Sequence, residues 1–143
     1  MYKQELKVPK DRIAVLVGKN GEIKKSIEKK GNVKVDVDSK TGDVFIIGED
    51  SLNVFDTKMV VKAIARGFVP EVAIKLFDES YIFELLDIRD YSGNSKKVQE
   101  RLKGRVIGSE GRSRRNLEQM TETKIVVYGK TVVIYYEIFL LKH

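Results

Sequence analysis

Cysteine and tryptophan are absent from this chain of 143 residues, and its single histidine is His143. Without cysteine there is no disulfide, no thiolate metal ligand and no cysteine nucleophile. One histidine is too few for a zinc site built from imidazoles, and it makes a Ser-His-Asp triad implausible. The composition therefore predicts no metal site and no cofactor.

Long hydrophobic runs are also missing. No stretch approaches the roughly 18 consecutive apolar residues of a membrane-spanning helix, and residues 1–7 (MYKQELK) lack the apolar centre of a signal peptide. Hydrophobic residues still make up 42% of the chain and charged residues 34%, which argues against global disorder. We expect a soluble, cytoplasmic protein without a membrane partner.

Positive charge is concentrated in two windows. Residues 94–115 hold eight basic and two acidic side chains, and residues 10–30 hold seven basic and three acidic ones. The intervening residues 31–93 hold seven basic and twelve acidic side chains. A charge run is usually only a solvated helix face, but two segregated basic windows favour an acidic partner such as nucleic acid.

The first half of the chain predicts the order strand, helix, turn, helix, strand, strand, helix. Apolar residues alternate in the strands and recur at helical spacing in the helices. We expect Gly31 to cap the second helix, and Leu52, Phe55, Met59, Val60 and Ala63 to form the apolar face of the last one. The predicted elements are a strand over 4–8, helices over 12–17 and 22–30, strands over 33–37 and 44–47, and a helix that starts after residue 50 or 51 and ends near residue 67.

The pattern then repeats at a constant offset of 90 residues. Val17 matches Ile107, Ile27 matches Leu117, and Val35 matches Ile125 at this offset. A constant offset is typical of internal duplication, so we expect a first domain over 1–67, a connector over 68–80 and a second domain over 81–143. The second set comprises a strand over 81–88, a loop over 90–94, helices over 97–107 and 112–120, and a hairpin of 124–128 with 131–136. The connector should contain a short helix over 71–77 that packs between the halves.

Each half carries a Gly-x-x-Gly tetrapeptide between two helices, at residues 18–21 and at residues 108–111. Glycines permit a tight turn and a close approach of another backbone. The helix that follows presents N–H groups and the positive end of its dipole, which favours an anion such as phosphate. A lone tetrapeptide is weak and also fits an ordinary helical hairpin, but its recurrence with a basic helix and a strand pair favours phosphate binding.

These motifs resemble the signature of KH domains, and the element order resembles the type I variant. The resemblance rests on VGKNG at 17–21 with Ile27, and on VIGSEG at 106–111 with Leu117. The segments RLKGRVIGSEGRSRRN (101–116) and VYGKTV (127–132) are more specific and are similar to archaeal KH-repeat proteins related to the ribosome-assembly factor called partner of Nob. The resemblance implies an α+β fold of two type I KH units, each holding about four nucleotides of single-stranded RNA or DNA at its turn.

The same resemblance implies a role in binding small-subunit rRNA near its 3-prime end during ribosome assembly. It also implies an association with the alpha subunit of translation initiation factor two. Arginines at 101 and 105 share one helix face, and arginine suits phosphate because its planar fork makes paired hydrogen bonds. The predicted RNA-binding residues are Gly18, Lys19, Asn20, Gly21, Lys24, Lys25, Arg101, Arg105, Gly108, Ser109, Gly111, Arg112, Arg114 and Arg115.

Three features depart from the family pattern. Glu110 places an acid in the second turn, and Ser113 replaces the apolar counterpart of Ile23. Residues 135–143 provide at most about two helical turns, so the second unit should lack most of its third helix. We expect this end to be disordered, packed on the first unit or exchanged with a neighbouring chain.

Other functions remain open at this point. Asp36 and Asp38 share a strand face and, with Asp43, could hold a hard cation, although an exposed polar hairpin explains them as well. No window supplies the G-x-x-x-x-G-K-[ST] loop of phosphate-transferring enzymes, so we predict that the chain is not an enzyme. A protein-interaction scaffold is the alternative to RNA binding. Base stacking could involve Tyr81, Tyr91, Tyr128, Tyr135 and Tyr136, and an apolar groove could be floored by Ile13, Leu16, Val17, Ile23 and Val35.

Overall fold

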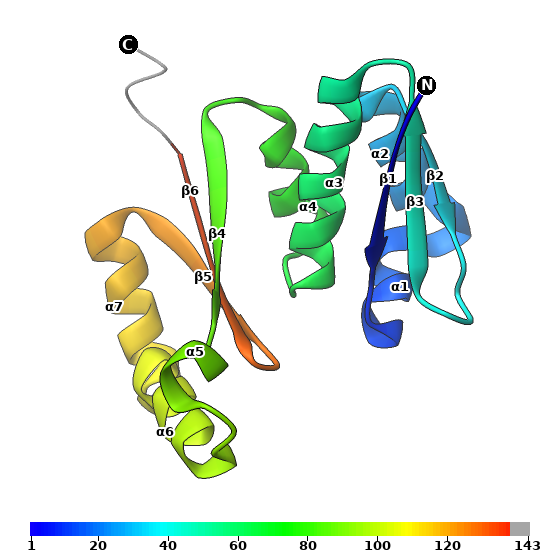
Figure 1. The fold of residues 1–143 in the computed structure, drawn as a ribbon. Helices are drawn as coiled ribbons and strands as arrows, with labels where there is room; N and C mark the ends of the chain where they lie inside the picture. Colours follow the sequence, from blue (N-terminus) through cyan, green and yellow to red (C-terminus); the bar gives the residue numbers. More distant parts are fainter. Residues whose placement is uncertain (138–143) are drawn as a thin grey trace. The chain divides into compact units, whose positions relative to one another are not determined.

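The computed structural model describes residues 1–137 and divides into two compact units, Met1–Glu79 and Ser80–His143 (Figure 1). Each unit contains a three-stranded antiparallel sheet with helices packed on it. The α+β class and the order of elements predicted from the sequence are confirmed. None of the helices in residues 1–137 is long and apolar enough to cross a membrane.

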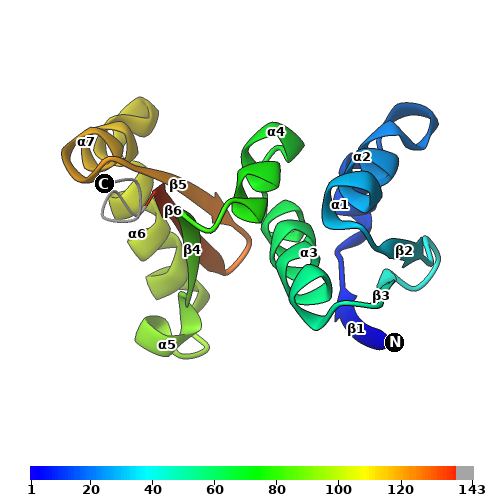
Figure 2. The same ribbon diagram turned by 90° about the horizontal axis from the view of Figure 1, so that it is seen from above.

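In the first unit the sheet order is β1-β3-β2, so β3, the third strand in the sequence, lies in the middle of the sheet. Apolar side chains from one face of this sheet, Val35, Val44 and Ile46, are completely buried. Helices α1, α2 and α3 cover this face, as Figure 2 shows. The elements are β1 (Tyr2–Lys7), α1 (Lys10–Val17), η1 (Lys19–Gly21), α2 (Glu22–Gly31), β2 (Lys34–Val37), β3 (Asp43–Gly48) and α3 (Ser51–Ala65).

Helix α3 begins at a side-chain cap and buries only part of the predicted face. The Asp50 carboxylate accepts hydrogen bonds from the N–H groups of the next turn, as an N-cap aspartate does. Leu52 and Phe55, predicted to be buried, are 58% and 54% exposed. The buried face consists of Val54, Thr57, Val60, Val61, Ala63, Ile64 and Ala65. Val60 and Ala63 are buried as predicted, whereas Leu52 and Phe55 are not, because more than one apolar stripe winds around this helix.

Gly31 is the last residue of α2 and not its cap. The residue with left-handed backbone dihedrals is Asn32, at φ 52° and ψ 50°, and asparagine tolerates this conformation. Gly31 is buried, and a Cβ added there would overlap the hydroxyl of Thr57 and press on the ring of Phe77. Glycine is therefore required at this position for the close packing of α2, and the predicted cap was wrong.

The connector is helical and packs on the first unit. Its two segments are α4 (Pro70–Ala73) and η2 (Ile74–Phe77), and both contact α3. Pro70 stands at the first helical position, where its missing N–H costs no intrahelical bond. The division of the chain into 1–67, 68–80 and 81–143 stays a prediction, and so does a position of the connector between the halves.

The second unit repeats the first with the sheet order β4-β6-β5. Its core is built on Ile88, Ile125 and Val132, against which the α6 residues Leu102 and Val106 pack. A short helix, α5, replaces the loop predicted over 90–94, because Ile88 accepts two backbone hydrogen bonds that close a turn. The elements are β4 (Tyr81–Asp87), α5 (Arg89–Ser92), α6 (Lys96–Ile107), η3 (Ser109–Gly111), α7 (Arg112–Thr121), β5 (Thr123–Tyr128) and β6 (Thr131–Glu137).

The two units differ in how deeply the helix after the Gly-x-x-Gly turn is buried. Ile27 on α2 is completely buried, whereas its counterpart Leu117 on α7 is 42% exposed. The predictions for the end of the chain fall on residues 138–143, which lie outside the described residues.

Candidate nucleic-acid interface

The two Gly-x-x-Gly turns have nearly the same backbone conformation. Gly18 and Gly108 have φ of 75° and 72°, and Gly21 and Gly111 have φ of 75° and 76°. In each turn the last N–H donates to the carbonyl of the first glycine, over 3.2 Å in the first unit and 3.3 Å in the second. The internal repeat therefore preserves a turn that leads directly into the N-terminus of a helix.

Glycine is required at the first position of each turn for two reasons, the backbone conformation and the lack of room for a side chain. A positive φ near 75° is strained for any residue with a side chain. A Cβ on Gly108 would lie 2.6 Å from the Oγ and 2.7 Å from the backbone nitrogen of Ser113. A Cβ on Gly18 would overlap the side chain of Ile23. The turn thus brings the start of α2 or α7 against its own first glycine.

The third residue of each turn is also left-handed but is not glycine. Asn20 has φ 56° and Glu110 has φ 54°. Asparagine adopts this region more easily than most residues, whereas glutamate has no such advantage. Both side chains are exposed, so each turn displays this residue to solvent. The first turn displays a neutral amide beside Lys19, and the second displays a carboxylate.

Most of the predicted basic residues are exposed around these turns. Within residues 1–137 no ion pair or hydrogen bond engages their side chains. Their charges are therefore available to an anionic ligand that lies along the turn and the start of the following helix. The exposed basic side chains are Lys19, Lys25, Arg101, Arg105, Arg112 and Arg115.

Arg114 is the exception among the predicted arginines, because it is bound to the protein itself. Its Nη1 donates to the carbonyl oxygen of Ile125 over 3.3 Å and lies 3.6 Å from a carboxylate oxygen of Glu118. Glu118 in turn accepts the N–H of Ile125 over 2.8 Å. Arg114 thus ties α7 to β5, while Arg112 and Arg115 remain free on the same helix.

The sequence analysis missed the matching contact in the first unit. Glu28 Oε2 accepts the N–H of Val35 over 2.9 Å, which is the Glu118 to Ile125 contact at an offset of 90 residues. The sequence pattern that could have revealed this contact is a glutamate at the same position of both halves, seven residues before an apolar strand residue. Arg12, counted in the first basic window, is likewise structural, since it donates to the carbonyls of Ile64 and Phe68 over 2.8 Å each.

The predicted apolar groove floor is mostly core. Ile13 is 7% exposed, and Leu16 and Val35 are completely buried. Val17 and Ile23, beside the first turn, are half-buried. Apolar contact with a ligand in the first unit can therefore come from these two side chains.

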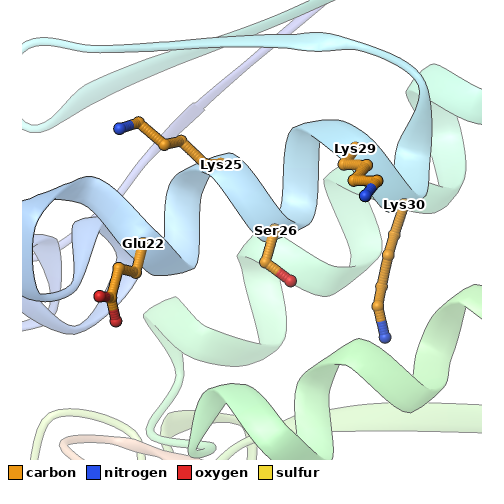
Figure 3. A pocket seen from close by; sticks show the side chains of 5 residues that line it. All are labelled: Glu22, Lys25, Ser26, Lys29 and Lys30. Carbon is orange, nitrogen blue, oxygen red and sulfur yellow. The ribbon is translucent and has the colours of Figure 1, made fainter.

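The outer face of α2 extends the positive surface beyond the predicted residues. Lys25, Lys29 and Lys30 surround a shallow hollow together with Glu22 and Ser26, and Figure 3 shows the lysine amines pointing outward from the helix. Lys29 and Lys30 belong to the basic window but not to the predicted site. Their spacing along α2 places them away from the turn, where they can only add long-range attraction.

The three aspartates considered as a cation site make local contacts in the structure. Asp38 accepts the N–H groups of Lys40 and Thr41 and so organises the β2–β3 turn. Asp36 pairs with Lys34, and Asp43 pairs with Lys7. Over residues 1–137 there is no cluster of three or more metal-ligating side chains.

Three of the candidate tyrosines make contacts within the second unit. The ring of Tyr135 stacks on Tyr81 at a centroid distance of 5.5 Å. The Tyr136 hydroxyl donates to Glu84 over 3.2 Å, and burial together with this carboxylate raises the pKa of Tyr136. Tyr91 is 71% exposed and is the tyrosine most accessible for stacking.

Comparison with known proteins places both units in one family. Residues 3–63 match the KH domain, and residues 82–135 match the eukaryotic type KH domain, KH-domain type I. A KH domain-containing protein of Methanocaldococcus jannaschii is 48% identical over 133 residues, which cover 90% of this chain. The chain spans 58% of the length of that relative.

Solved structures agree with this placement. Dim2p from Pyrococcus horikoshii matches with 40% identity and a TM-score of 0.87, over 99% of this chain and 85% of that one. A complex of a/eIF2alpha, aDim2p and rRNA from the same organism contains a chain with 40% identity and a TM-score of 0.86, over 99% of this chain and 79% of that one. A protein of unknown function from Aeropyrum pernix matches with 34% identity and a TM-score of 0.90, over 95% and 74% of the two chains.

Proposed function

The chain belongs to the KH family, in the group of tandem KH proteins that includes archaeal Dim2p, and from this premise we propose that it binds single-stranded RNA through its two Gly-x-x-Gly turns. The observation that carries the proposal is the duplicated turn. Each copy leads into a helix N-terminus beside exposed cationic side chains that have no partner within residues 1–137.

The chemistry of each turn suits a phosphate. The positive ends of the α2 and α7 dipoles favour an anion at each turn. The first N–H groups of these helices, those of Glu22 and Arg112, donate to the carbonyls of Lys19 and Ser109 and so brace the turns. The turn is compact enough for a nucleic-acid backbone to approach its glycines closely. Lys19 supplies a mobile cation in the first unit, while Arg112 and Arg115 compensate for Glu110 in the second.

The relatives make the RNA and a protein partner more specific. One solved relative was crystallised in a complex with a/eIF2alpha and rRNA. By this relationship we propose that the chain binds small-subunit rRNA near its 3-prime end during ribosome assembly. The alpha subunit of translation initiation factor two is the proposed protein partner. A cytoplasmic location follows from this role, as does a function without catalysis.

Replacing Lys19 and Asn20 together by Asp tests the first turn. Two carboxylates at the positive end of α2 should repel phosphate and weaken binding to single-stranded rRNA fragments by roughly tenfold or more, the scale of 1.4 kcal/mol or above. The variant should keep its circular dichroism spectrum, since both side chains are exposed. Binding is measured by fluorescence anisotropy of a labelled fragment.

The matched control is Lys3→Asp with Gln4→Asp, which makes the same change in charge at two exposed positions on β1. This strand is the sheet edge opposite β2, so the control should bind almost as the wild type does. Equal losses in both variants would mean that only net charge matters, and the turn would then not be the binding site.

A protein-interaction scaffold is the second candidate, and Glu110 favours it for the second unit. An acid displayed at the tip of this turn disfavours phosphate and favours a basic protein surface. If the wild type binds the initiation-factor subunit but no single-stranded RNA at 50 mM salt, the scaffold is the correct function.

A further inference from the structure

The first turn contains an asparagine that is followed directly by a glycine, Asn20 and Gly21. An asparagine side chain loses its amide when the backbone nitrogen of the next residue attacks the side-chain carbonyl, and this makes asparagine a heat-sensitive residue type. A glycine at the next position favours the attack, because it has no Cβ to crowd the nitrogen and its backbone moves freely. The other asparagines all precede larger residues, and they are Asn32, Asn53, Asn94 and Asn116.

The surroundings of this pair leave it accessible to water and base. The Asn20 side chain is exposed and makes no hydrogen bond within the described part of the chain. A Cβ on Gly21 would meet only the Cε of Lys25, at 3.9 Å, so little packing hinders movement there. Gly21 is also the N-cap residue of α2, and the positive end of the helix dipole favours the negatively charged nitrogen that makes the attack.

The folded turn holds the two reacting groups apart. Asn20 has ψ 24°, so the Gly21 nitrogen nearly eclipses the backbone nitrogen of Asn20. The Cβ of Asn20 is a different substituent of the same tetrahedral carbon and therefore points away from the Gly21 nitrogen. Ring closure needs a large rotation about the Asn20 Cα–C bond. That rotation breaks the 3.2 Å hydrogen bond from the Gly21 N–H to the Gly18 carbonyl, so the turn has to open locally.

We propose that Asn20 is a deamidation site that the folded turn protects, and that its deamidation replaces a phosphate site by an acidic turn. The effect on phosphate rests on the proposed function, whereas the reaction itself does not. The exposed amide, the open space around Gly21 and the helix N-terminus supply the reactivity. The hydrogen-bonded, left-handed backbone of the turn supplies the protection.

The reaction consumes one water and releases one ammonia. Hydroxide takes the proton from the Gly21 nitrogen, which attacks Cγ of Asn20 and forms a new C–N bond. The bond from Cγ to Nδ2 breaks, and the side-chain nitrogen leaves as ammonia with a proton from water. Water then hydrolyses the five-membered succinimide at one of its two carbonyls, which gives aspartate or isoaspartate.

Both products weaken the turn as an anion site. Aspartate places a carboxylate beside Lys19 at the position that Glu110 has in the second turn. Glu110, at φ 54° and ψ 27°, shows that this backbone conformation accommodates an acidic residue. Isoaspartate routes the main chain through the side chain, so the hydrogen bond from Gly21 to Gly18 is lost. A negative charge at the tip of the turn repels phosphate in either case.

Peptide mass spectrometry of the full chain measures the reaction directly. The chain is incubated at pH 7 and at pH 9, in buffer and in guanidinium chloride, and the conversion of each asparagine is followed over time. Asn20 should convert in the native chain, faster at pH 9 and more slowly than in the denaturant. Asn94, which is also exposed but precedes Ser95, should convert much more slowly. A native chain in which Asn20 never converts, or converts as fast as in the denaturant, would overturn the inference.

Bound RNA should slow the reaction, because it binds the closed turn. With a single-stranded rRNA fragment at ten times its Kd, the open turn becomes about tenfold rarer. The rate at Asn20 should fall by about this factor, while the rate at Asn94 should not change. An unchanged rate at Asn20 with the RNA bound would contradict the proposed role of the first turn and the predicted effect on phosphate, but not the deamidation site.

The affinity for the same RNA fragment tests the consequence of deamidation. The wild type should lose affinity in step with conversion of Asn20, by roughly two- to fivefold at completion, the scale of one exposed charge pair. Asn20→Gln is the matched control, since glutamine would have to close a larger ring, and it should keep its own starting affinity through the same incubation. Equal losses in both chains, or no loss in the converted wild type, would overturn the predicted effect on phosphate. A fresh wild type that binds no RNA would overturn the proposed function, and the mass measurement would still decide whether Asn20 is the site.

Discussion

Individual residues determine whether the second turn can form. Gly108 has φ 72° and no room for a Cβ, whereas Gly104, one helical turn earlier, has nothing within 4 Å of the position that a Cβ would take. Gly108→Ala should therefore destabilise the second unit by about 1–3 kcal/mol. Gly104→Ala lies inside α6 and should stabilise it by about 0.5–1 kcal/mol.

Urea denaturation of the two variants measures both changes in the free energy of unfolding. The pair forms its own control, because each variant adds one methyl group to the same short segment. A Gly108→Ala chain as stable as the wild type would contradict the turn geometry.

A second residue-scale prediction concerns Asp56 on α3. Partial burial, with the charges of Glu79 and Asp50, raises the pKa of its carboxyl above the usual value. The folded state thus holds this proton more tightly than the unfolded state, and the resulting stability is lost as the pH rises through the folded-state pKa. At pH 7 Asp56→Asn should raise the midpoint of thermal unfolding, and this difference should vanish below about pH 3, where unfolded aspartate is protonated.

The exposed carboxylate of Glu5 on β1 provides the comparison, because Glu5→Gln makes the same change in net charge. A stabilisation of Asp56→Asn that persists undiminished at pH 3 would show that packing, and not ionisation, is responsible.

At the scale of the elements, local patterns predicted most of the fold. Alternation identified the strands, and the two tetrapeptides placed both turns and the helices around them. The inward face of α3 was predicted only in part, because Leu52 and Phe55 also follow a helical period and only the neighbouring elements decide which stripe is buried. The C-cap of α2 was predicted at Gly31 but lies at Asn32. A glycine can be required either by a positive φ or by close packing, and at Gly31 the reason is close packing.

The candidate site was predictable to the same degree. The charge and glycine patterns identified the residues around the turns, but charge alone could not separate Arg114 from Arg115. The two are adjacent in sequence, and only the position of β5 shows that one is bound to Ile125 and Glu118 while the other is exposed. Side-chain contacts between a helix and a strand eleven residues apart depend on the folded geometry and carry little local signal.

On the scale of the whole molecule, duplication gives two related turns with different chemistry. The first displays Lys19 and Asn20, and the second displays Ser109 and Glu110 before an arginine-rich helix. If both units bind one RNA strand, as the proposed function implies, the linked contacts should raise the overall affinity above that of either unit. The acidic residues of 31–93 separate the two basic windows along the sequence.

The salt dependence of RNA binding tests this account most directly. Log affinity falls linearly with log salt, by about 0.7 for each phosphate contact to a single strand. Arg112→Ala with Arg115→Ala removes the two exposed arginines at the start of α7 and leaves Arg114 in place. Lys96→Ala with Lys97→Ala removes the same charge at the other end of α6, roughly 16 Å along the helix from the turn. The account predicts a flatter slope for the arginine variant, by up to about 0.7 per lost contact, and a nearly unchanged slope for the lysine variant. Equal slopes for the wild type and the arginine variant would contradict it.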